Sequence, residues 1–337
     1  MAIQWEKVVA PLATGEAVKA IAPVIISASR ATDIPAFYSE WLANRLAAGY
    51  AAWIHPFTGR KSYVSFARTR LLVFWSKNPQ PLLARLARIE TLGFRQYYFQ
   101  YTLNDYEIER LEPQVPPLQH RIETLREIAK RIGPEKVIWR FDPLLLGGGV
   151  TPKILADRIR RIRDGVAGST RRLVISFLDL ARYRSVQQNV TRAKMNIREL
   201  THDDRLELAT AIGAIAREGG LSVGSCAEAI DLASWGIEHN RCIDDRLMTR
   251  CFGDDRALMS FLGVPPRAAG GVEPGTTTEA VRNVKDAGQR TTCQCVASKD
   301  IGRYHTCPHQ CVYCYANGIT AGIQTSRRRH DPAADLI

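Results

Sequence analysis

Short apolar runs alternate with longer amphipathic stretches from residue 24 to about residue 226. The short runs are rich in β-branched and aromatic residues and are bounded by polar or turn residues, which is typical of buried strands. The pattern predicts six strands, at residues 24–28, 71–75, 97–102, 137–141, 173–177 and 221–224. Residues 50–66 have a glycine between two β-rich arms, and this segment predicts an inserted hairpin.

Amphipathic helices are predicted between these strands. In residues 79–92, two prolines lie near the start, leucines and isoleucines fall on one face, and Gly93 ends the helix. In residues 203–218, two aspartates open the helix and Gly219 follows its last turn. The other three predicted helices are residues 35–48, 117–131 and 152–163.

Alternation of strands and helices at this spacing implies right-handed βαβ units with parallel strands. The predicted fold class is α/β, either a doubly wound sheet or a partial or full (β/α) TIM-like barrel, and six units favour the barrel. Residues 1–225 are expected to form this barrel and residues 226–322 a cysteine-rich lobe, in which residues 263–292 have the composition of a linker. We expect the polar tail, residues 323–337, to be disordered.

Composition narrows the class of protein. The chain has 337 residues, 45% hydrophobic and 24% charged, which fits a folded, soluble protein. We find no secretion signal and no apolar run of the ~18 residues that span a membrane, so we expect a cytoplasmic protein without a membrane partner. The net charge of +12 favours an anionic ligand. The basic clusters carry no nucleic-acid-binding motif, so a small molecule and a nucleic acid both remain candidate substrates.

The eight cysteines carry the candidate chemistry, because five of them lie within residues 293–314. Cytoplasmic thiols stay reduced, so clustered cysteines there indicate metal binding rather than disulfides. Cys307, Cys311 and Cys314 have the spacing C-x3-C-x2-C, which brings three sulfurs to one point. Three thiolates would leave one iron of a [4Fe–4S] cluster open to a small molecule or solvent. The alternative is a zinc site completed by His305 or His309.

Four further cysteines allow a second site. Cys226, Cys242, Cys293 and Cys295 would complete the ligand set of another cluster, suited to structure or electron relay. The alternative is that Cys226 and Cys242 are small buried apolar residues. The sequence leaves both interpretations open and assigns Cys251 to neither site.

Five motifs span most of the chain: Ser27-Ala-Ser-Arg-Ala-Thr-Asp-Ile-Pro35, Phe74-Trp-Ser-Lys-Asn-Pro79, Tyr101-Thr-Leu-Asn104, Trp139-Arg-Phe-Asp-Pro143 and the late Thr-Cys-Pro-His-Gln-Cys-Val-Tyr-Cys-Tyr-Ala-Asn. Together they resemble a bacterial family known as "domain of unknown function 1848". The cysteine loop also resembles that of radical S-adenosylmethionine enzymes, spore photoproduct lyase among them. This second resemblance implies that S-adenosylmethionine binds the open iron and is split to a 5′-deoxyadenosyl radical. It also implies an electron donor such as flavodoxin or ferredoxin.

The position of the loop departs from the radical family, in which the cysteine loop follows the first strand. Here it follows the last predicted strand, so we hypothesise a circular permutation in which the strand at residues 24–28 comes next in space. Ser27, Ser29 and Arg30 would then take the place of the stretch that binds the methionine group. With Asp33 and Tyr313, these are the expected cofactor-binding residues.

Catalytic residues of α/β barrels lie at the carboxyl ends of the strands. Lys77, Asn104, Arg140 and Asp142 occupy such positions and are the expected catalytic residues, although Arg140 and Asp142 also suit a structural ion pair. The leading prediction is a radical enzyme acting on an unknown substrate at the barrel mouth. The alternatives are an enzyme that repairs or modifies nucleic acid, and a non-catalytic zinc or iron–sulfur protein that senses redox state or binds nucleic acid.

Overall fold

Eight parallel strands form the central sheet of the computed structural model, which describes residues 3–265, 284–318 and 321–337. Their order in the sheet is β13-β12-β10-β8-β7-β6-β3-β14. The strands are β3 (Ile25–Ala28), β6 (Leu71–Ser76), β7 (Tyr97–Thr102), β8 (Val137–Leu144), β10 (Arg172–Phe177), β12 (Ser222–Ser225), β13 (Ile237–His239) and β14 (Lys299–Asp300). The six strands predicted from the sequence are confirmed, with ends shifted by at most a few residues. The protein is therefore an α/β fold around a large parallel sheet.

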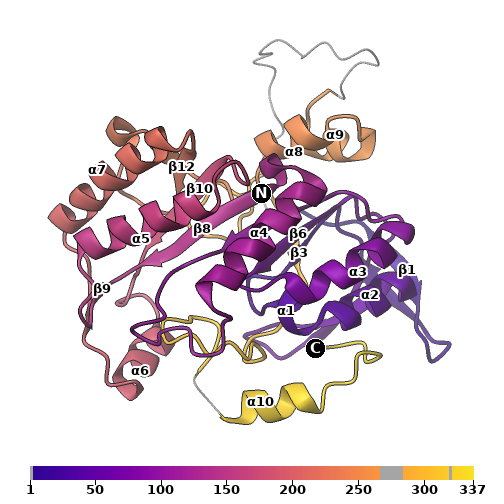
Figure 1. Ribbon diagram of the computed structural model, residues 1–337. Coiled ribbons are helices and arrows are strands. Elements are labelled where there is room, and N and C mark those ends of the chain that lie inside the picture. Colours follow the sequence, from indigo (N-terminus) through magenta and orange to yellow (C-terminus); the bar gives the residue numbers. More distant parts are fainter. Residues whose placement is uncertain (1–2, 266–283, 319–320) are drawn as a thin grey trace.

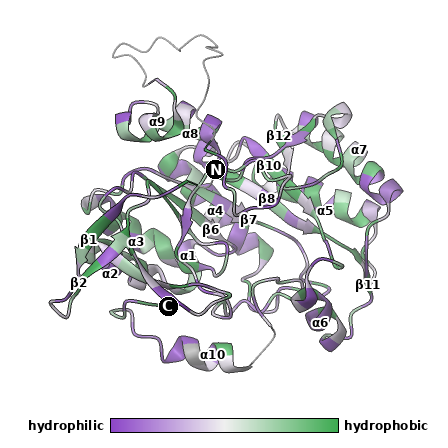
Figure 2. Cartoon of the chain, turned by 180° about the vertical axis from the view of Figure 1, so that it is seen from behind, coloured by the Kyte–Doolittle hydropathy of each residue, from purple (hydrophilic) through white to green (hydrophobic). Residues whose placement is uncertain are grey.

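Helices follow most of the strands and cover one face of the sheet (Figure 1). They are α1 (Ile34–Phe37), α2 (Ser39–Ala48), α3 (Gln80–Thr91), α4 (Leu118–Ile132), α5 (Pro152–Gly165) and α7 (His202–Glu218). A further helix, α6 (Arg184–Arg192), lies apart from them, and its side chains donate to the carbonyl oxygens of Cys314 and Tyr315. The helix predicted at residues 35–48 is divided at Tyr38, whose backbone leaves the helical region and whose hydroxyl donates to the Thr306 carbonyl oxygen at 2.7 Å. Figure 2 shows α5 and α7 with both hydrophobic and hydrophilic residues, as amphipathic helices have.

The sheet is buried on both faces, because successive side chains of a strand point to opposite sides. Ile26, Leu72 and Phe74 pack in the core beneath the helices. Ile25, Leu71 and Val73 face the other side, which we call the inner face, and pack in a second core. That second core is completed by α8 (Asp245–Phe252), α9 (Arg256–Leu262) and parts of residues 284–296.

The segment expected as a cysteine-rich lobe, residues 226–322, contributes strands to the main sheet. β13 pairs with β12, and β14 pairs with β3 at the opposite edge. No pairing joins β13 to β14 in the part of the chain that the structure describes. Most of the linker predicted at residues 263–292 lies outside the described residues, which resume at Val284.

A smaller sheet flanks the main one. Its strands are β1 (Lys7–Pro11), β2 (Ala17–Ile21), β4 (Tyr50–Ile54) and β5 (Lys61–Ser65), in the order β1-β2-β5-β4. The antiparallel pairing of β4 with β5 confirms the predicted hairpin. Short elements complete the chain: β9 (Leu146–Gly147) pairs with β11 (Ile197–Arg198), and η1 (Pro134–Lys136) and η2 (Ala233–Trp235) are 3₁₀ turns. None of the described helices has the length and apolar character that a membrane crossing requires.

The expectation of a disordered tail at residues 323–337 is wrong. Most of α10 (Ala321–Arg328) lies within this segment (Figure 1), and the residues after it form hydrogen bonds with α2 and β4. The indole N–H of Trp41 donates to the Ala334 carbonyl oxygen at 2.9 Å, and Arg45 pairs with Asp335 at 2.7 Å. These partners are 290 or more positions apart in the sequence, so the local polarity of the tail gave no sign of them.

Replacement of Asp335 by Asn tests this docking. The Arg45 side chain is only 7% exposed, so loss of the carboxylate charge leaves a buried guanidinium poorly compensated. We expect a loss of about 1–3 kcal/mol in the free energy of unfolding and faster proteolysis of the tail. The matched control is Asp331→Asn, because Asp331 is exposed and its side chain accepts locally from the Ala333 N–H. Equal proteolysis rates for the two variants would contradict the docking.

Candidate functional site

Four neighbouring strands, β14, β3, β6 and β7, bring their carboxyl ends to one edge of the sheet. Asp300, the last residue of β14, links β14 to the end of β3. Its carboxylate accepts from the hydroxyls of Ser27 and Ser29, at 2.8 and 2.6 Å, and from the Arg30 N–H at 2.8 Å. Gly302 is needed for this approach, because a Cβ there would lie 1.9 Å from the Ser29 hydroxyl oxygen. The hydroxyls expected to bind a cofactor therefore hold β14 in place.

The cysteine loop follows β14 along the same edge. Backbone N–H groups of Asp33 and His309 donate to the Cys307 sulfur, and those of Ala316 and Asn317 donate to the Cys314 sulfur. Burial, together with the Asp33 charge, raises the pKa of Cys307 to about 12. Burial also raises the pKa values of Cys311 and Cys314. The thiols are thus protonated in the metal-free chain, and a bound metal would displace their protons.

Tyr313, inside the loop, is fixed by a buried polar network. The Nζ atom of Lys77 lies 2.8 Å from a Glu112 carboxylate oxygen and 3.0 Å from the Tyr313 hydroxyl, which itself donates to Glu112. The Asn104 amide donates to Glu112 at 3.0 Å and to the Tyr313 oxygen at 2.9 Å. Burial alone would raise the pKa of Glu112, but the charges of Lys77 and Arg121 outweigh it and lower the pKa to about 2. In this arrangement Lys77, Asn104 and Tyr313 hold the loop.

A second buried pair supports the loop from β6 and α1. Asp33 accepts from the Ser76 hydroxyl at 2.7 Å and the Lys77 N–H at 2.8 Å, and it lies 2.9 Å from His309 Nε2. The other ring nitrogen of His309 lies 3.2 Å from the Gln114 carbonyl oxygen. Burial alone would raise the pKa of Asp33, but its hydrogen bond to His309 and the His309 charge lower it overall. Because both nitrogens of His309 have partners, this side chain is poorly placed to complete a zinc site.

Arg140 and Asp142 do not join this network through their side chains. They lie on the inner face, where they form an ion pair at 2.5 Å and where an Arg140 nitrogen is 3.0 Å from the Cys242 sulfur. Cys226, Cys293 and Cys295 also lie there. The structure thus divides the predicted site residues into an edge group around the cysteine loop and an inner group around Cys242. The Asn104 amide connects the two groups, because it donates to the Asp142 carbonyl oxygen at 3.0 Å.

Arg30 lies between the two groups. Its carbonyl oxygen accepts from the Tyr315 hydroxyl at 2.9 Å, next to Cys314, while its guanidinium interacts electrostatically with Asp300, Cys295 and Cys242. Its Nη2 atom is buried and has no hydrogen-bond partner in the described part of the chain. Arg30 therefore keeps a donor available for a ligand, whereas Ser27, Ser29, Asp33 and Tyr313 are engaged within the protein.

Donors for a metal are present, but a finished coordination geometry is not. Among the described residues, no three His, Cys, Asp or Glu side chains already stand as ligands around one ion. All eight cysteines are free thiols. The loop offers three thiols, one buried and two half-buried, with N–H groups directed at two of the sulfurs. This chemistry suits an iron–sulfur cluster.

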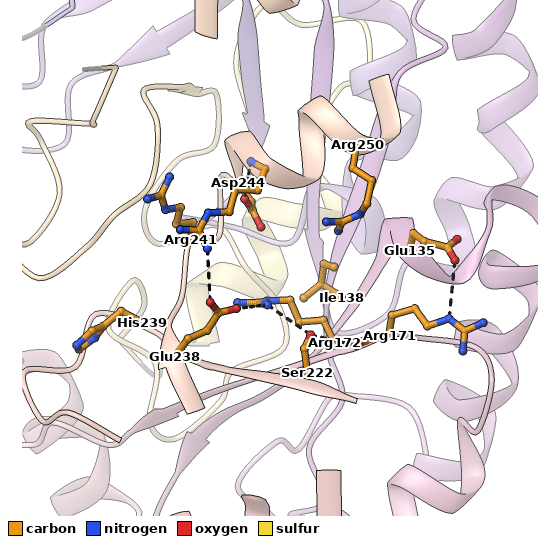
Figure 3. Close-up of a pocket in the computed structure, with 11 residues that line it drawn as sticks. Glu135, Ile138, Arg171, Arg172, Ser222, Glu238, His239, Arg241, Asp244 and Arg250 are labelled. Carbon is orange, nitrogen blue, oxygen red and sulfur yellow. Dashed lines mark hydrogen bonds and ion pairs between the residues drawn. The ribbon is translucent and has the colours of Figure 1, made fainter. Parts of the chain in front are cut away.

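A pocket of about 290 Å³ lies at the opposite end of the strands (Figure 3). Several arginines line it, and most of them are paired with acidic residues: Arg172 with Glu238 at 2.7 Å, and Arg171 with Glu135 at 3.8 Å. Five arginines line the pocket against three carboxylates, so its lining remains net positive.

A family model described as "Domain of unknown function (DUF1848)" matches residues 25–316, which is most of the chain. The chain belongs to this family. No curated protein matches the sequence of this family member.

Two solved structures share only weak similarity with the family member. One is a crystal structure of a putative alpha-L-fucosidase from Bacteroides thetaiotaomicron, with 12% identity, 49% of this chain and 66% of that chain covered, and a TM-score of 0.23. The other is a xylose isomerase-like TIM barrel/4-hydroxyphenylpyruvate dioxygenase fusion protein, with 16% identity, 63% and 32% coverage, and a TM-score of 0.26. The family member thus spans about two thirds of the first chain and about a third of the second.

Sequence reasoning missed Glu112 and Asp300, which organise the edge group. Glu112 lies in the long connection between β7 and α4, and Asp300 ends a strand of only two residues. Neither position carries a periodic signal. A usable sign was the placement of Asp300 two residues before a glycine and shortly before the cysteine loop.

Replacement of Glu112 by Gln tests the edge network. Glu112 is buried with a side chain only 4% exposed, so the variant leaves Lys77 and Arg121 without a buried counter-charge. We expect a loss of about 3–5 kcal/mol in the free energy of unfolding, measured in urea. The control, Glu90→Gln, removes a partly exposed partner of Arg131 and should cost about 0–1 kcal/mol. A Glu112→Gln effect no larger than that of the control would refute the network.

Proposed function

We propose that this family member is an iron–sulfur enzyme of the radical S-adenosylmethionine type, in which Cys307, Cys311 and Cys314 ligate a [4Fe–4S] cluster with one open iron. The observation that carries this proposal is the pairing of β14 with β3, which puts the cysteine loop directly after the strand next to β3. When bound, such a cluster supplies the electron that splits S-adenosylmethionine to a 5′-deoxyadenosyl radical.

Strand order supports a circularly permuted, partial (β/α) barrel. From β3 to β13, each strand of the main sheet pairs with the next strand of that sheet along the chain. The exception is β14, which pairs with β3 but comes from the C-terminal part of the chain. If the chain were reconnected from β14 to β3, every neighbour would be sequential, as in a barrel. The cysteine loop would then follow the first strand, and Ser27 to Arg30 would end the second.

The residues around the loop have defined parts in this proposal. Lys77 places a positive charge beside Cys311, which offsets the negative charge of thiolate ligands. Glu112 and Asn104 hold Tyr313, so they position the loop rather than contact substrate. The free Nη2 of Arg30 would pair with the carboxylate of the methionine group, since a guanidinium is well suited to bind a carboxylate.

An electron donor such as flavodoxin or ferredoxin would reduce the cluster, and the reducing cytoplasm would suit it. We propose a small molecule as substrate, because the basic clusters of the chain carry no nucleic-acid-binding motif. His309 is disfavoured as a zinc ligand for the loop, because Asp33 and Gln114 engage both of its ring nitrogens.

The test is anaerobic iron and sulfide analysis with a 5′-deoxyadenosine assay. Wild-type protein given a reductant and S-adenosylmethionine should release 5′-deoxyadenosine, and Cys311→Ala should lose that activity completely together with the iron of the loop. Cys251→Ser is the matched control, because Cys251 lies on α8 and belongs to neither group of candidate metal ligands. A colourless wild-type protein that contains zinc and releases no 5′-deoxyadenosine would exclude the proposal.

A further inference from the structure

Four cysteines from three distant segments meet on the inner face of the sheet. Cys226 directly follows β12, Cys242 lies between β13 and α8, and Cys293 and Cys295 precede β14. The sulfurs of Cys226 and Cys242 are 3.3 Å apart. Hydrogen bonds between side chains also connect Cys242 with Cys295 and Cys295 with Cys293. We call these residues the four-thiol group.

Several N–H groups are directed at these sulfurs. The backbone N–H groups of Cys242 and Ile243 lie 3.3 and 3.4 Å from the Cys295 sulfur. The Asn240 amide and the Arg140 guanidinium donate to the Cys242 sulfur at 3.1 and 3.0 Å. Donors of this kind stabilise a thiolate over a thiol, and hydrogen bonds to the sulfurs are a regular feature of metal–thiolate centres.

Two arginines bring positive charge to this group, and one of them, Arg140, is also paired with Asp142. Arg140 is 2% exposed, and the positive charge of the Arg30 guanidinium interacts with Cys295 and Cys242. Both guanidinium groups lie 5.2 Å from the ring centre of Trp75. Four thiolates around a divalent ion, or around a cluster core of charge +2, carry a net charge of −2, which a buried site must balance. If the four cysteines were uncharged thiols without a metal, they would need no positive charge nearby.

The backbone is also shaped to bring these groups together. A Cβ at Gly224 would lie 2.8 Å from the Asn240 side chain, so glycine at this position lets Asn240 approach the sheet and reach Cys242. The amide of Gln100 and the hydroxyl of Tyr98 both donate to the Cys242 carbonyl oxygen at 2.7 Å. Cys242 is therefore fixed from its backbone as well as from its sulfur.

We propose that Cys226, Cys242, Cys293 and Cys295 form a second, fully thiolate-ligated metal site, separate from the cysteine loop and independent of its proposed activity. Four sulfur ligands suit an iron–sulfur cluster or Zn²⁺. Tetrahedral zinc–sulfur bonds of about 2.3 Å place sulfurs roughly 3.8 Å apart, so the pair Cys226 and Cys242 opens slightly on binding. With four protein ligands, the bound metal has no open position for substrate. Either metal would stabilise the inner face, and an iron–sulfur cluster could also hold an electron.

The test compares metal content in full-length proteins purified and reconstituted without oxygen. Iron, sulfide and zinc are counted in wild type, Cys242→Ala, Cys311→Ala, the double variant and Cys251→Ser. We expect each single variant to keep the metal of the other site, the double variant to keep none, and Cys251→Ser to match wild type. Iron with sulfide, or zinc alone, in Cys311→Ala identifies the occupant.

Cys242 is buried, so a second variant protects against a simple folding failure. Cys226→Ser changes the most accessible of the four cysteines and should also remove the second metal. In the metal-loaded wild type, the four thiols should resist alkylation until a chelator is added. Metal content equal to wild type in both the Cys242 and Cys226 variants would overturn the proposal, as would a Cys226–Cys242 disulfide in the reconstituted protein.

The two proposals fail in different ways. Loss of metal in Cys242→Ala but not in Cys311→Ala would leave the four-thiol site standing and remove the open cluster. The reverse result would remove the four-thiol site and leave the open cluster.

Discussion

The pairing of β14 with β3 is the contact on which both cysteine groups depend. β14 has only two residues, yet Cys293 and Cys295 precede it and the loop from Cys307 to Cys314 follows it. The Asp300 carboxylate secures this short strand with three hydrogen bonds to the end of β3. A strand this short has little intrinsic stability, so side-chain contacts, rather than its backbone hydrogen bonds with β3, define its position.

The sheet could be predicted because its strands repeat a local pattern. Apolar residues on both faces produce continuous hydrophobic runs, and these identified β3, β6, β7, β8, β10 and β12. β13 and β14 escaped prediction because strands of two or three residues are too short to show a period. The docked tail escaped for a different reason, since its partners Trp41 and Arg45 lie far away in the sequence.

The candidate site was only partly accessible from the sequence. The spacing of Cys307, Cys311 and Cys314 is local and was visible, whereas the meeting of Cys226 with Cys242 and Cys295 depends on the tertiary fold. Alternation along β8 did contain a hint, because Arg140 has the same parity as Ile138 and therefore faces the inner side. The sequence predicts Lys77 and Arg140 as parts of one catalytic site, because both lie near strand ends. In the structure Lys77 belongs to the edge group and Arg140 to the inner group.

The late position of β14 in the chain also has a consequence for biosynthesis. Lys77, Asn104 and Glu112 leave the ribosome long before Cys311, so the buried charges of the edge network wait for Tyr313 while the rest of the sheet forms. Contacts between such distant segments are slow to form because a long loop must close first. A chaperone or metal donor that acts on this protein would therefore meet a nearly complete sheet with one edge still open.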